Sequence, residues 1–215
     1  TRMVGRLMSV SRLPESARQQ ISLRQVAVEV AAFLQPECQA RQIDLRTEFS
    51  DPIAPVFAER DACLQILINL CLNAVQVQGQ GGRVVLSLCS VSGQAWGRCG
   101  DWAQIEVRDA GPGIPPDRRQ TLFEPFYSTR REGHGLGLAI VHDIVQKLDG
   151  LIEVGEAPEG GACFRVLLPS GPADHVVPPG FAGAPSLGQA SVADSAVRTA
   201  TGTAAPPRGD GQLSA

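Results

Sequence analysis

The chain has 215 residues, of which 43% are hydrophobic, and a formal net charge of −3 at pH 7. This length allows one sizeable domain with extensions, and the charge gives no basic surface of the kind that binds nucleic acid. The apolar stretches fall short of the roughly 18 residues that cross a membrane. The six cysteines form no CxxC pair, which favours reduced thiols in a cytosol over a disulfide framework or a zinc site.

Composition divides the chain into three regions. Residues 1–20 carry apolar residues at helical spacing as far as Pro14, and we expect the end of a longer helix and a linker. Residues 21–170 hold all of the strong periodicity and predict one folded domain. Residues 171–215 are rich in Ala, Gly, Pro and Ser, which predicts a disordered tail. Because the chain begins at Thr1 and has no signal peptide, we expect it to be part of a longer protein.

Helices and strands alternate within the middle region. We expect helices over 23–39, 61–77, 116–122 and 136–148, and strands over 43–49, 56–58, 83–92, 102–108, 151–154 and 163–168. Several neighbouring strands are joined as hairpins, so the sheet should be mixed, with about three helices on one face. The predicted fold class is therefore α+β, a two-layer α/β sandwich that is not doubly wound.

The helix expected over 61–77 contains LINLCLNAVQ and carries amides on one face, opposite an apolar face that predicts the core. Gln65, Asn69, Asn73 and Gln76 are spaced four, four and three residues apart. A solvated polar face is the ordinary explanation for such a pattern. A second explanation is that the amide oxygens take part in coordinating Mg²⁺, which prefers oxygen ligands. The helix alone leaves both open.

The strand expected over 102–108 is followed by DAGPGIP, residues 109–115. As a turn, this segment uses Gly111 and Gly113 for positive φ and its prolines for stiffness. A ligand interpretation adds that the missing Cβ atoms let a flat ring lie against the backbone. Asp109 would then accept a hydrogen bond from an exocyclic amine.

A glycine-rich segment, REGHGLGLAI at residues 131–140, precedes the last expected helix. Its alternating glycines and the positive end of the helix dipole direct free N–H groups at one place, which indicates a phosphate cradle. It is neither a Walker A loop nor a GxGxxG fingerprint, and a flexible approach to the helix is the alternative.

The preceding segment, LFEPFYSTRR at residues 122–131, favours the phosphate interpretation. Phe123 and Phe126 can anchor the base of a loop. Arg130 and Arg131 then lie beside the glycines as candidate cations.

Taken in order, LINLCLNA, DAGPG, FEPFYSTR and GHGLGLAIV resemble four boxes of one family. These are the N, G1, F and G2 boxes of the catalytic ATP-binding (GHKL or HATPase) domain of bacterial two-component sensor histidine kinases. The resemblance covers about residues 21–170, includes the closing strand GGACFRVLLP, and is greatest to the nitrogen-regulation type. It implies the Bergerat-type ATP-binding fold, with ATP and Mg²⁺ as cofactors. Residues 1–20 then resemble the end of the second helix of the dimerisation hairpin.

The resemblance also implies the residues of a nucleotide site. Mg²⁺ is expected at Asn69 and Asn73. Catalysis is expected from these two amides and from Arg130 or Arg131, the candidate cations for the γ-phosphate. Nucleotide contacts are expected from Asn73, Gln76, Asp109, Gly111, Gly113, Phe123, Phe126, Gly133, His134, Gly135, Leu136 and Gly137. Of these, Asp109 would bind the adenine amine, and Gly135 and Gly137 would wrap the phosphates.

Two positions depart from related proteins in ways that bear on chemistry. His134 stands where the family's phosphate loop usually has Thr or Ser. A hydrogen-bond donor is therefore kept, but nucleotide binding by this loop can respond differently to pH. Asn69 stands where related ATPases such as DNA gyrase have a Glu that activates water. An amide cannot act as a general base, so we expect slow hydrolysis and a γ-phosphate kept for a protein acceptor.

Kinases of this kind phosphorylate a histidine on the first dimerisation helix. The histidines of this chain are His134, His142 and His175, and none lies in that context. His142 is followed by an acidic residue, as the acceptor is, but its place after the phosphate loop favours an ordinary surface or packing role. We therefore expect the acceptor hairpin to lie upstream, outside this chain.

The implied partners are that hairpin and a response regulator, with a homodimer in the full-length protein and no nucleic acid. The implied location is cytoplasmic, and an upstream segment could attach the full-length protein to a membrane. The alternative is a stand-alone nucleotide-regulated switch, similar to the anti-sigma factors that share the fold.

Overall fold

The computed structural model describes residues 18–95, 98–127, 135–158 and 160–170. These residues fall within one compact unit of the chain. The helix end expected before Pro14 and the tail expected over 171–215 lie outside the described residues. Within the described part, no helix is both long and apolar enough to cross a membrane.

The described elements follow the expected order closely. They are β1 (Gln19–Ile21), α1 (Leu23–Ala40), β2 (Asp44–Phe49), β3 (Val56–Ala58), α2 (Arg60–Gln78), β4 (Arg83–Ala95), β5 (Arg98–Asp109), the 3-10 turns η2 (Pro116–Arg118) and η3 (Thr121–Phe123), α3 (Gly137–Lys147), β6 (Leu151–Glu156) and β7 (Ala162–Pro169). The helices expected over 23–39, 61–77 and 136–148 are confirmed as α1, α2 and α3, each with ends within one residue of the expected ones.

Three local features differ from the expectation. The hairpin of β4 and β5 is longer than the strands expected over 83–92 and 102–108. The helix expected over 116–122 is instead two 3-10 turns, because so short a segment cannot sustain an α-helix. β1 was not predicted, since three mostly polar residues give no alternation signal.

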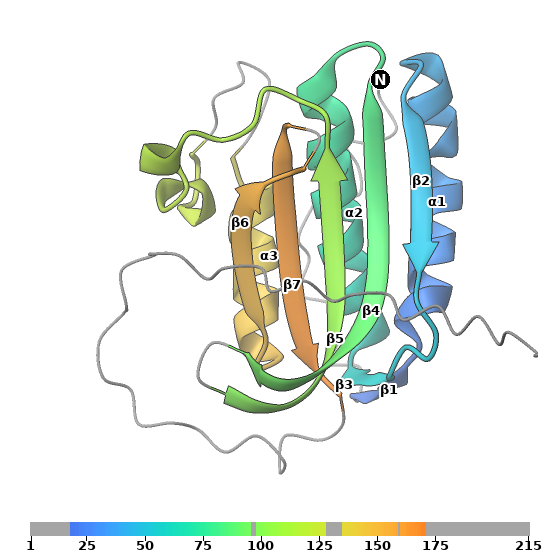
Figure 1. The fold of residues 1–215 in the computed structure, drawn as a ribbon, viewed down its shortest axis with the longest axis vertical. Helices are drawn as coiled ribbons and strands as arrows, with labels where there is room; N and C mark the ends of the chain where they lie inside the picture. The colour runs from blue at the N-terminus through green and yellow to red at the C-terminus, as the bar shows by residue number, and fades with distance from the viewer. Residues whose placement is uncertain (1–17, 96–97, 128–134, 159, 171–215) are drawn as a thin grey trace, which may run out of the picture. The chain divides into compact units, whose positions relative to one another are not determined.

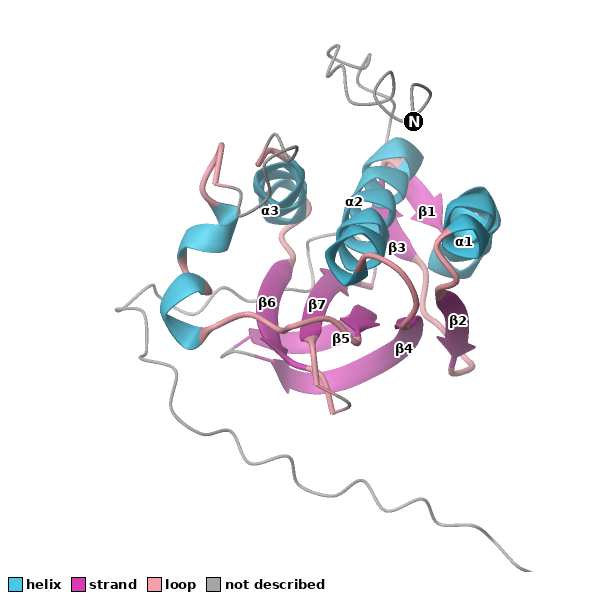
Figure 2. Cartoon of the chain, turned by 90° about the horizontal axis from the view of Figure 1, so that it is seen from above, coloured by secondary structure: helices cyan, strands magenta, loops and turns pink. Residues whose placement is uncertain are grey.

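The main sheet has five strands in the order β2-β4-β5-β7-β6. β2 and β4 are parallel and the other neighbours are antiparallel. Figure 1 shows the sheet from one side, and Figure 2 shows α1, α2 and α3 together on its other side. This arrangement confirms the predicted mixed sheet and two-layer α+β class.

A separate two-stranded sheet joins the start of the described chain to α2. β1 pairs antiparallel with β3, with Ile21 opposite Val56. β3 then leads through Glu59 into α2. Because β1 begins at Gln19, the described fold starts two residues before the expected domain boundary at residue 21.

The core forms between the three helices and the sheet, with α2 at its centre. α2 contacts both α1 and α3 and lies between them (Figure 2). Its buried side chains are Cys63, Ile66, Leu67, Leu70, Cys71, Leu72, Ala74 and Val75. Each large apolar side chain stabilises the fold by about 1.5–3 kcal/mol when fully buried, so α2 is firmly held.

Free thiols, in agreement with the expectation of reduced cysteines, are found at Cys38, Cys63, Cys71, Cys89 and Cys163. Cys38, Cys63, Cys71 and Cys163 are buried. Burial raises the pKa of Cys63 and of Cys71 from 9.0 to about 12. These sulfurs are therefore neutral core side chains at ordinary pH.

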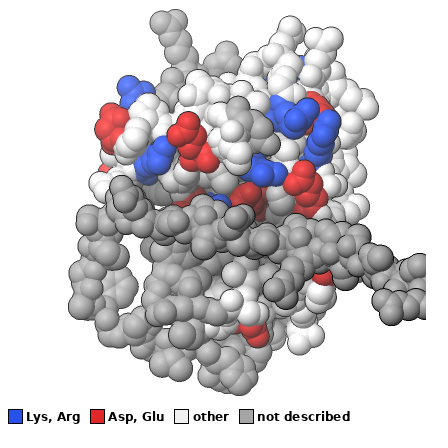
Figure 3. Space-filling model, in the orientation of Figure 1, with Lys and Arg blue, Asp and Glu red and all other residues white. Residues whose placement is uncertain are grey.

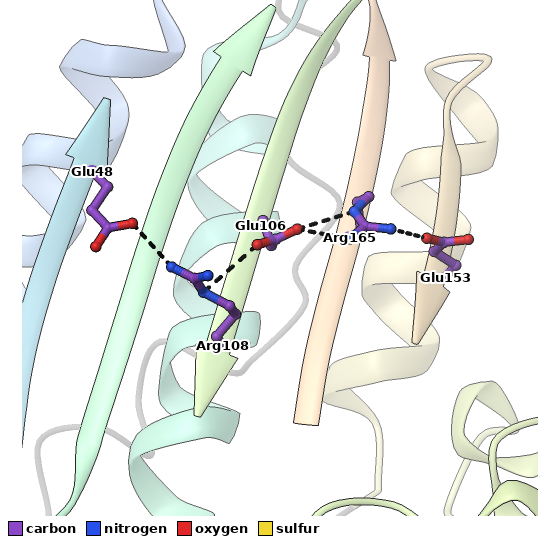
Figure 4. A network of polar contacts seen from close by, with 5 residues as sticks. All are labelled: Glu48, Glu106, Arg108, Glu153 and Arg165. Atoms are coloured by element: carbon purple, nitrogen blue, oxygen red, sulfur yellow. Dashed lines mark hydrogen bonds and ion pairs between the residues drawn. The ribbon is translucent and has the colours of Figure 1, made fainter. Parts of the chain in front are cut away.

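The face of the sheet away from the helices carries a row of ion pairs whose side chains come from four strands, β2, β5, β7 and β6 (Figure 4). Arg165 donates to Glu106 through Nε and Nη2, both at 3.0 Å, and to Glu153 through Nη1. Arg108 Nη2 donates to Glu48 at 3.0 Å. Positive and negative side chains alternate on this face (Figure 3), so neither sign accumulates in the row.

Candidate functional site

The amide side chains of α2 occupy the side of the helix that the core does not cover. From residue 69 to residue 76, only Asn69, Asn73 and Gln76 are not buried. Asn69 and Asn73 are half-buried and Gln76 is exposed. Gln65, one turn before Asn69, is half-buried as well. The helix therefore presents carboxamide groups at a surface rather than in the core, as the spacing predicted.

Asp109 ends β5 on the helix side of the sheet. It is only 4% exposed and is the one buried charged side chain among the described residues. Its Oδ1 accepts hydrogen bonds from the backbone N–H groups of Gly111, at 2.9 Å, and Ala162, at 3.2 Å. Burial of a carboxylate is costly unless it is hydrogen-bonded, so these donors help to hold Asp109 in place.

The turn between β6 and β7 packs directly on Asp109. Gly161 has φ of 86°, and a Cβ added there would lie 2.1 Å from the carbonyl oxygen of Asp109. Only glycine fits this approach. The sequence gave no sign that Gly161 meets a residue of the candidate site.

The loop after β5 also packs on the end of α2. A Cβ added at Gly111 would lie 2.8 Å from Asp109 Oδ1 and 3.0 Å from Val77 Cγ1. Gly113 has φ of 72°, the positive value expected of it, whereas the positive φ expected of Gly111 is wrong. Asp109 and Gly111 therefore pack against the last turn of α2, and Gly113 lies against the turn between β6 and β7, where its added Cβ would be 3.4 Å from the carbonyl oxygen of Gly161.

The two ends of the segment that joins η3 to α3 meet through the backbone. The N–H of Phe126 donates to the carbonyl of Gly135 at 3.0 Å. Gly135 has φ of 63°, and a Cβ there would lie 2.5 Å from the carbonyl carbon of Phe126. Phe126 and Gly135, which stand on either side of residues 127–134 in the chain, are thus held together. Arg130, Arg131, Gly133 and His134 lie outside the described residues.

The two phenylalanines expected to anchor this loop behave differently. The ring of Phe123 contacts the ring of His142 on α3, with 5.5 Å between centroids. The ring of Phe126 is 77% exposed, so the expected ring anchor is wrong there. At Phe126 the backbone provides the anchor instead. His142 is thereby placed as a packing residue, the ordinary role expected of it.

The start of α3 lies beside α2. A Cβ added at Gly137, the first residue of α3, would lie 3.4 Å from Asn69 Oδ1. Leu136, which precedes it and is 36% exposed, makes no side-chain cap. The first N–H groups of a helix have no acceptor within it and carry partial positive charge. The oxygen of Asn69 and these donors therefore border the same place.

α2 connects the two halves of the site. Asn69 meets the start of α3, and Val77 meets the loop after Asp109. These residues are eight positions apart, or about 12 Å along the helix. One end offers a buried carboxylate and the other offers helix donors and amide oxygens. Such a site suits a ligand with an amine at one end and anionic groups at the other.

Comparison with known proteins places this geometry in a family. Residues 58–172, more than half of the chain, match the family described as histidine kinase-, DNA gyrase B-, and HSP90-like ATPase. The chain is similar to the sensor histidine kinase ZraS of Escherichia coli O157:H7, at 34% identity over 168 residues, 78% of this chain and 35% of that protein. It is also similar to the adaptive-response sensory kinase SasA of Synechococcus sp. (strain CC9902), at 34% identity over 156 residues, 70% of this chain and 39% of that protein. The chain thus spans between a third and two fifths of these relatives.

Solved structures give the same picture. Full-length ShkA in complex with AMPPNP superposes with a TM-score of 0.62 at 31% identity, covering 73% of this chain and 32% of that one. The catalytic domain of the histidine kinase ThkA superposes with a TM-score of 0.62 at 25% identity, covering 72% of this chain and 97% of that one.

Proposed function

Since the chain belongs to the family of histidine kinase-, DNA gyrase B- and HSP90-like ATPases, we propose that it is the ATP-binding kinase domain of a sensor histidine kinase. In this proposal it transfers the γ-phosphate of ATP to a histidine of a dimerisation hairpin, for relay to a response regulator. The observation that carries the proposal is the arrangement along α2, with buried Asp109 at one end and Asn69 beside the start of α3 at the other.

Each end of the site has a proposed role in holding ATP. Asp109 accepts a hydrogen bond from the adenine amine, and the glycine loop after it lets the base lie close to the backbone. The N–H groups at the start of α3 bind the phosphates, as helix N-termini do for anions. Gly133, His134 and an arginine, Arg130 or Arg131, would complete the phosphate end; all four precede Gly135 in the chain.

Asn69 and Asn73 are proposed to hold Mg²⁺ through their side-chain oxygens. The donor set fits, because amide oxygens are hard ligands and Asn69 Oδ1 borders the start of α3. When bound, the ion supplies neutralisation of phosphate charge. The residues themselves contribute positioning and electrostatic stabilisation, which are the main sources of catalysis in phosphoryl transfer. With an amide at Asn69, water activation is weak and the phosphoryl group is kept for the protein acceptor.

The proposed partners follow from the same reaction. A dimerisation hairpin brings the acceptor histidine, a response regulator takes the phosphoryl group onward, and the full-length protein is a homodimer. Assignment to the nitrogen-regulation type and a cytoplasmic location stay predictions. The alternative, a stand-alone nucleotide switch, is not favoured, because ZraS and SasA, the two relatives described above, are named as sensor or sensory kinases.

Calorimetric titration of the whole chain with Mg-ATP tests the nucleotide site, beside the variants Asp109→Ala and Asn73→Ala. We expect binding in the parent that requires Mg²⁺ and falls in both variants. Label from γ-labelled ATP should then pass to a supplied dimerisation hairpin, and not to the same hairpin with its histidine replaced. Rapid ATP hydrolysis without label transfer would contradict the kinase proposal and favour another ATPase of the family.

A further inference from the structure

The last carbonyl groups of α3 accept backbone hydrogen bonds in a common helix-capping pattern. Asp149 is left-handed, with φ of 55°. Its N–H donates to Gln146 at 3.0 Å, the N–H of Gly150 donates to Val145 at 2.9 Å, and the N–H of Leu148 donates to Ile144 at 3.0 Å. This is the Schellman pattern, which satisfies carbonyls that a helix end otherwise leaves open.

The remaining carbonyl of the last turn, that of Lys147, is bonded from far away in the sequence. Arg18 Nη2 donates to it at 2.6 Å, across 129 positions of the chain. A cation at this end of a helix is also attracted by the negative end of the helix dipole. Arg18 therefore completes the end of α3 by hydrogen bonding and by charge.

Arg18 stands immediately before β1, where the described chain begins. β1 pairs with β3, and β3 leads directly into α2. Four consecutive residues, 18–21, are thus tied to α3 through Arg18 and to the start of α2 through the β1–β3 pairing. Both helices of the candidate nucleotide site are held from this one segment.

The opposite end of α3 borders the phosphate end of that site. α3 has 11 residues, or a length of about 16 Å. Such a helix moves as a unit, so a change in the position of its last turn also changes the position of Gly137 relative to Asn69. The base end, with Asp109 and Gly161, belongs to other elements and would not follow that movement.

We infer that Arg18 is a positioning residue, which fixes α3 against α2 and couples the segment entering the domain to the phosphate end of the nucleotide site. The inference rests on the proposed function, because it assumes that the start of α3 binds phosphates. Arg18 itself is too far along the helix to touch the nucleotide. Its effect on binding passes through the placement of α3.

Arg18→Ala in the whole chain tests this coupling, with Arg18→Lys to restore the cation and Arg46→Ala as the matched control. Arg46 is also exposed and paired, with Asp44, but it lies on the edge strand β2. Calorimetry gives the dissociation constants of Mg-ATP and of adenosine, which has no phosphates. Hydrogen–deuterium exchange reports the amides of residues 148–150.

We expect Arg18→Ala to weaken Mg-ATP binding by about two- to fivefold and to leave adenosine binding unchanged. Exchange at residues 148–150 should rise in this variant, Arg18→Lys should recover most of the affinity, and Arg46→Ala should match the parent. If the parent binds Mg-ATP and Arg18→Ala binds it with the same affinity, the inference about Arg18 is overturned and the proposed function is not affected. Equal losses for Mg-ATP and adenosine would also overturn the inference, since they would indicate general weakening. A parent that binds neither ligand would overturn the proposed function itself.

Discussion

The carboxylate of Asp109 accepts a hydrogen bond from the backbone N–H of Ala162, which lies 53 residues further along the chain. The end of β5 is therefore held by the turn between β6 and β7 as well as by its own loop. Recognition of a base at Asp109 depends on both parts of the chain.

Asp109→Asn should abolish most nucleotide binding while keeping the fold. The asparagine oxygen can still accept from Gly111 and Ala162, but its amide group replaces an acceptor with a donor. Because a hydrogen bond to a charged group contributes about 1.5–3 kcal/mol, we expect at least a tenfold loss of affinity for both adenosine and Mg-ATP. Calorimetry measures this loss, with thermal unfolding as the control for the fold. Unchanged adenosine binding in a folded variant would exclude Asp109 as the base acceptor.

Gly161→Ala should weaken both the fold and nucleotide binding, since the new methyl group would collide with the backbone of Asp109. We expect the free energy of unfolding in urea to fall by about 2–4 kcal/mol. Gly160→Ala is a close control, because Gly160 also has positive φ, 83°, but no atom lies within 4 Å of an added Cβ. That variant should lose only about 1 kcal/mol and keep its affinity for Mg-ATP. Equal effects of the two substitutions would show that backbone strain, and not contact with Asp109, is responsible.

Asn73→Ala should weaken binding of the phosphate end of ATP and leave binding of its base end unchanged. Loss of one amide oxygen removes a proposed Mg²⁺ ligand, so Mg-ATP should bind about tenfold more weakly while adenosine binds as in the parent. Gln65→Ala, on the same face two turns before Asn73, should change neither constant. Chelation of Mg²⁺ should weaken ATP binding in the parent more than in Asn73→Ala. An Asn73→Ala variant with the same response to chelation as the parent would contradict the metal assignment.

The buried thiols predict a loss of stability at high pH. The pKa of Cys71 rises from 9.0 to about 12 on folding, because burial disfavours the thiolate. An unfolded chain therefore releases this proton at lower pH than the folded chain, so Cys71 lowers the free energy of unfolding as pH rises from about 9 towards 12. Below pH 9 this contribution to stability is fully present.

Urea unfolding at several pH values measures this effect in the parent and in Cys71→Ala. The variant should be less stable than the parent by a constant amount up to about pH 9, and the difference should shrink above it. Cys89→Ala is the comparison, since Cys89 is only half-buried. A constant difference between Cys71→Ala and the parent up to pH 11 would argue against a buried neutral thiol.

Local patterns in the sequence were sufficient for most of the fold. Apolar residues at helical spacing gave α1, α2 and α3 to within one residue, and alternation gave the strands of the main sheet. The amide face of α2 followed from the spacing of Asn69 and Asn73 alone. These features depend on neighbours within one or two turns, which is the range that periodicity reports.

The features that the sequence did not predict depend on contacts between distant segments. Gly161 packs against the backbone of Asp109, and the side chain of Arg18 donates to the carbonyl of Lys147. The backbone N–H of Phe126 donates to the carbonyl of Gly135. Nothing in the local pattern of either partner distinguishes such a contact from an ordinary turn or surface residue. β1 belongs to the same group, because its three residues form a strand only where β3 supplies a partner. The roles expected of Arg130, Arg131, Gly133 and His134 stay predictions, since these residues lie outside the described ones.

The row of ion pairs on the face of the sheet away from the helices affects contacts between copies of this domain. A second sheet packed against that face would remove water from the carboxylate and guanidinium groups of the row, which costs free energy. The ion pairs already exist in the single domain, so they would provide no new interaction to offset this cost. Face-to-face stacking of two sheets is therefore disfavoured, although no helix in the described part of the chain covers this side of the sheet. In the proposed function the domain approaches a hairpin, delivers a phosphoryl group and withdraws again, and a face that does not adhere to neighbouring domains would favour that cycle.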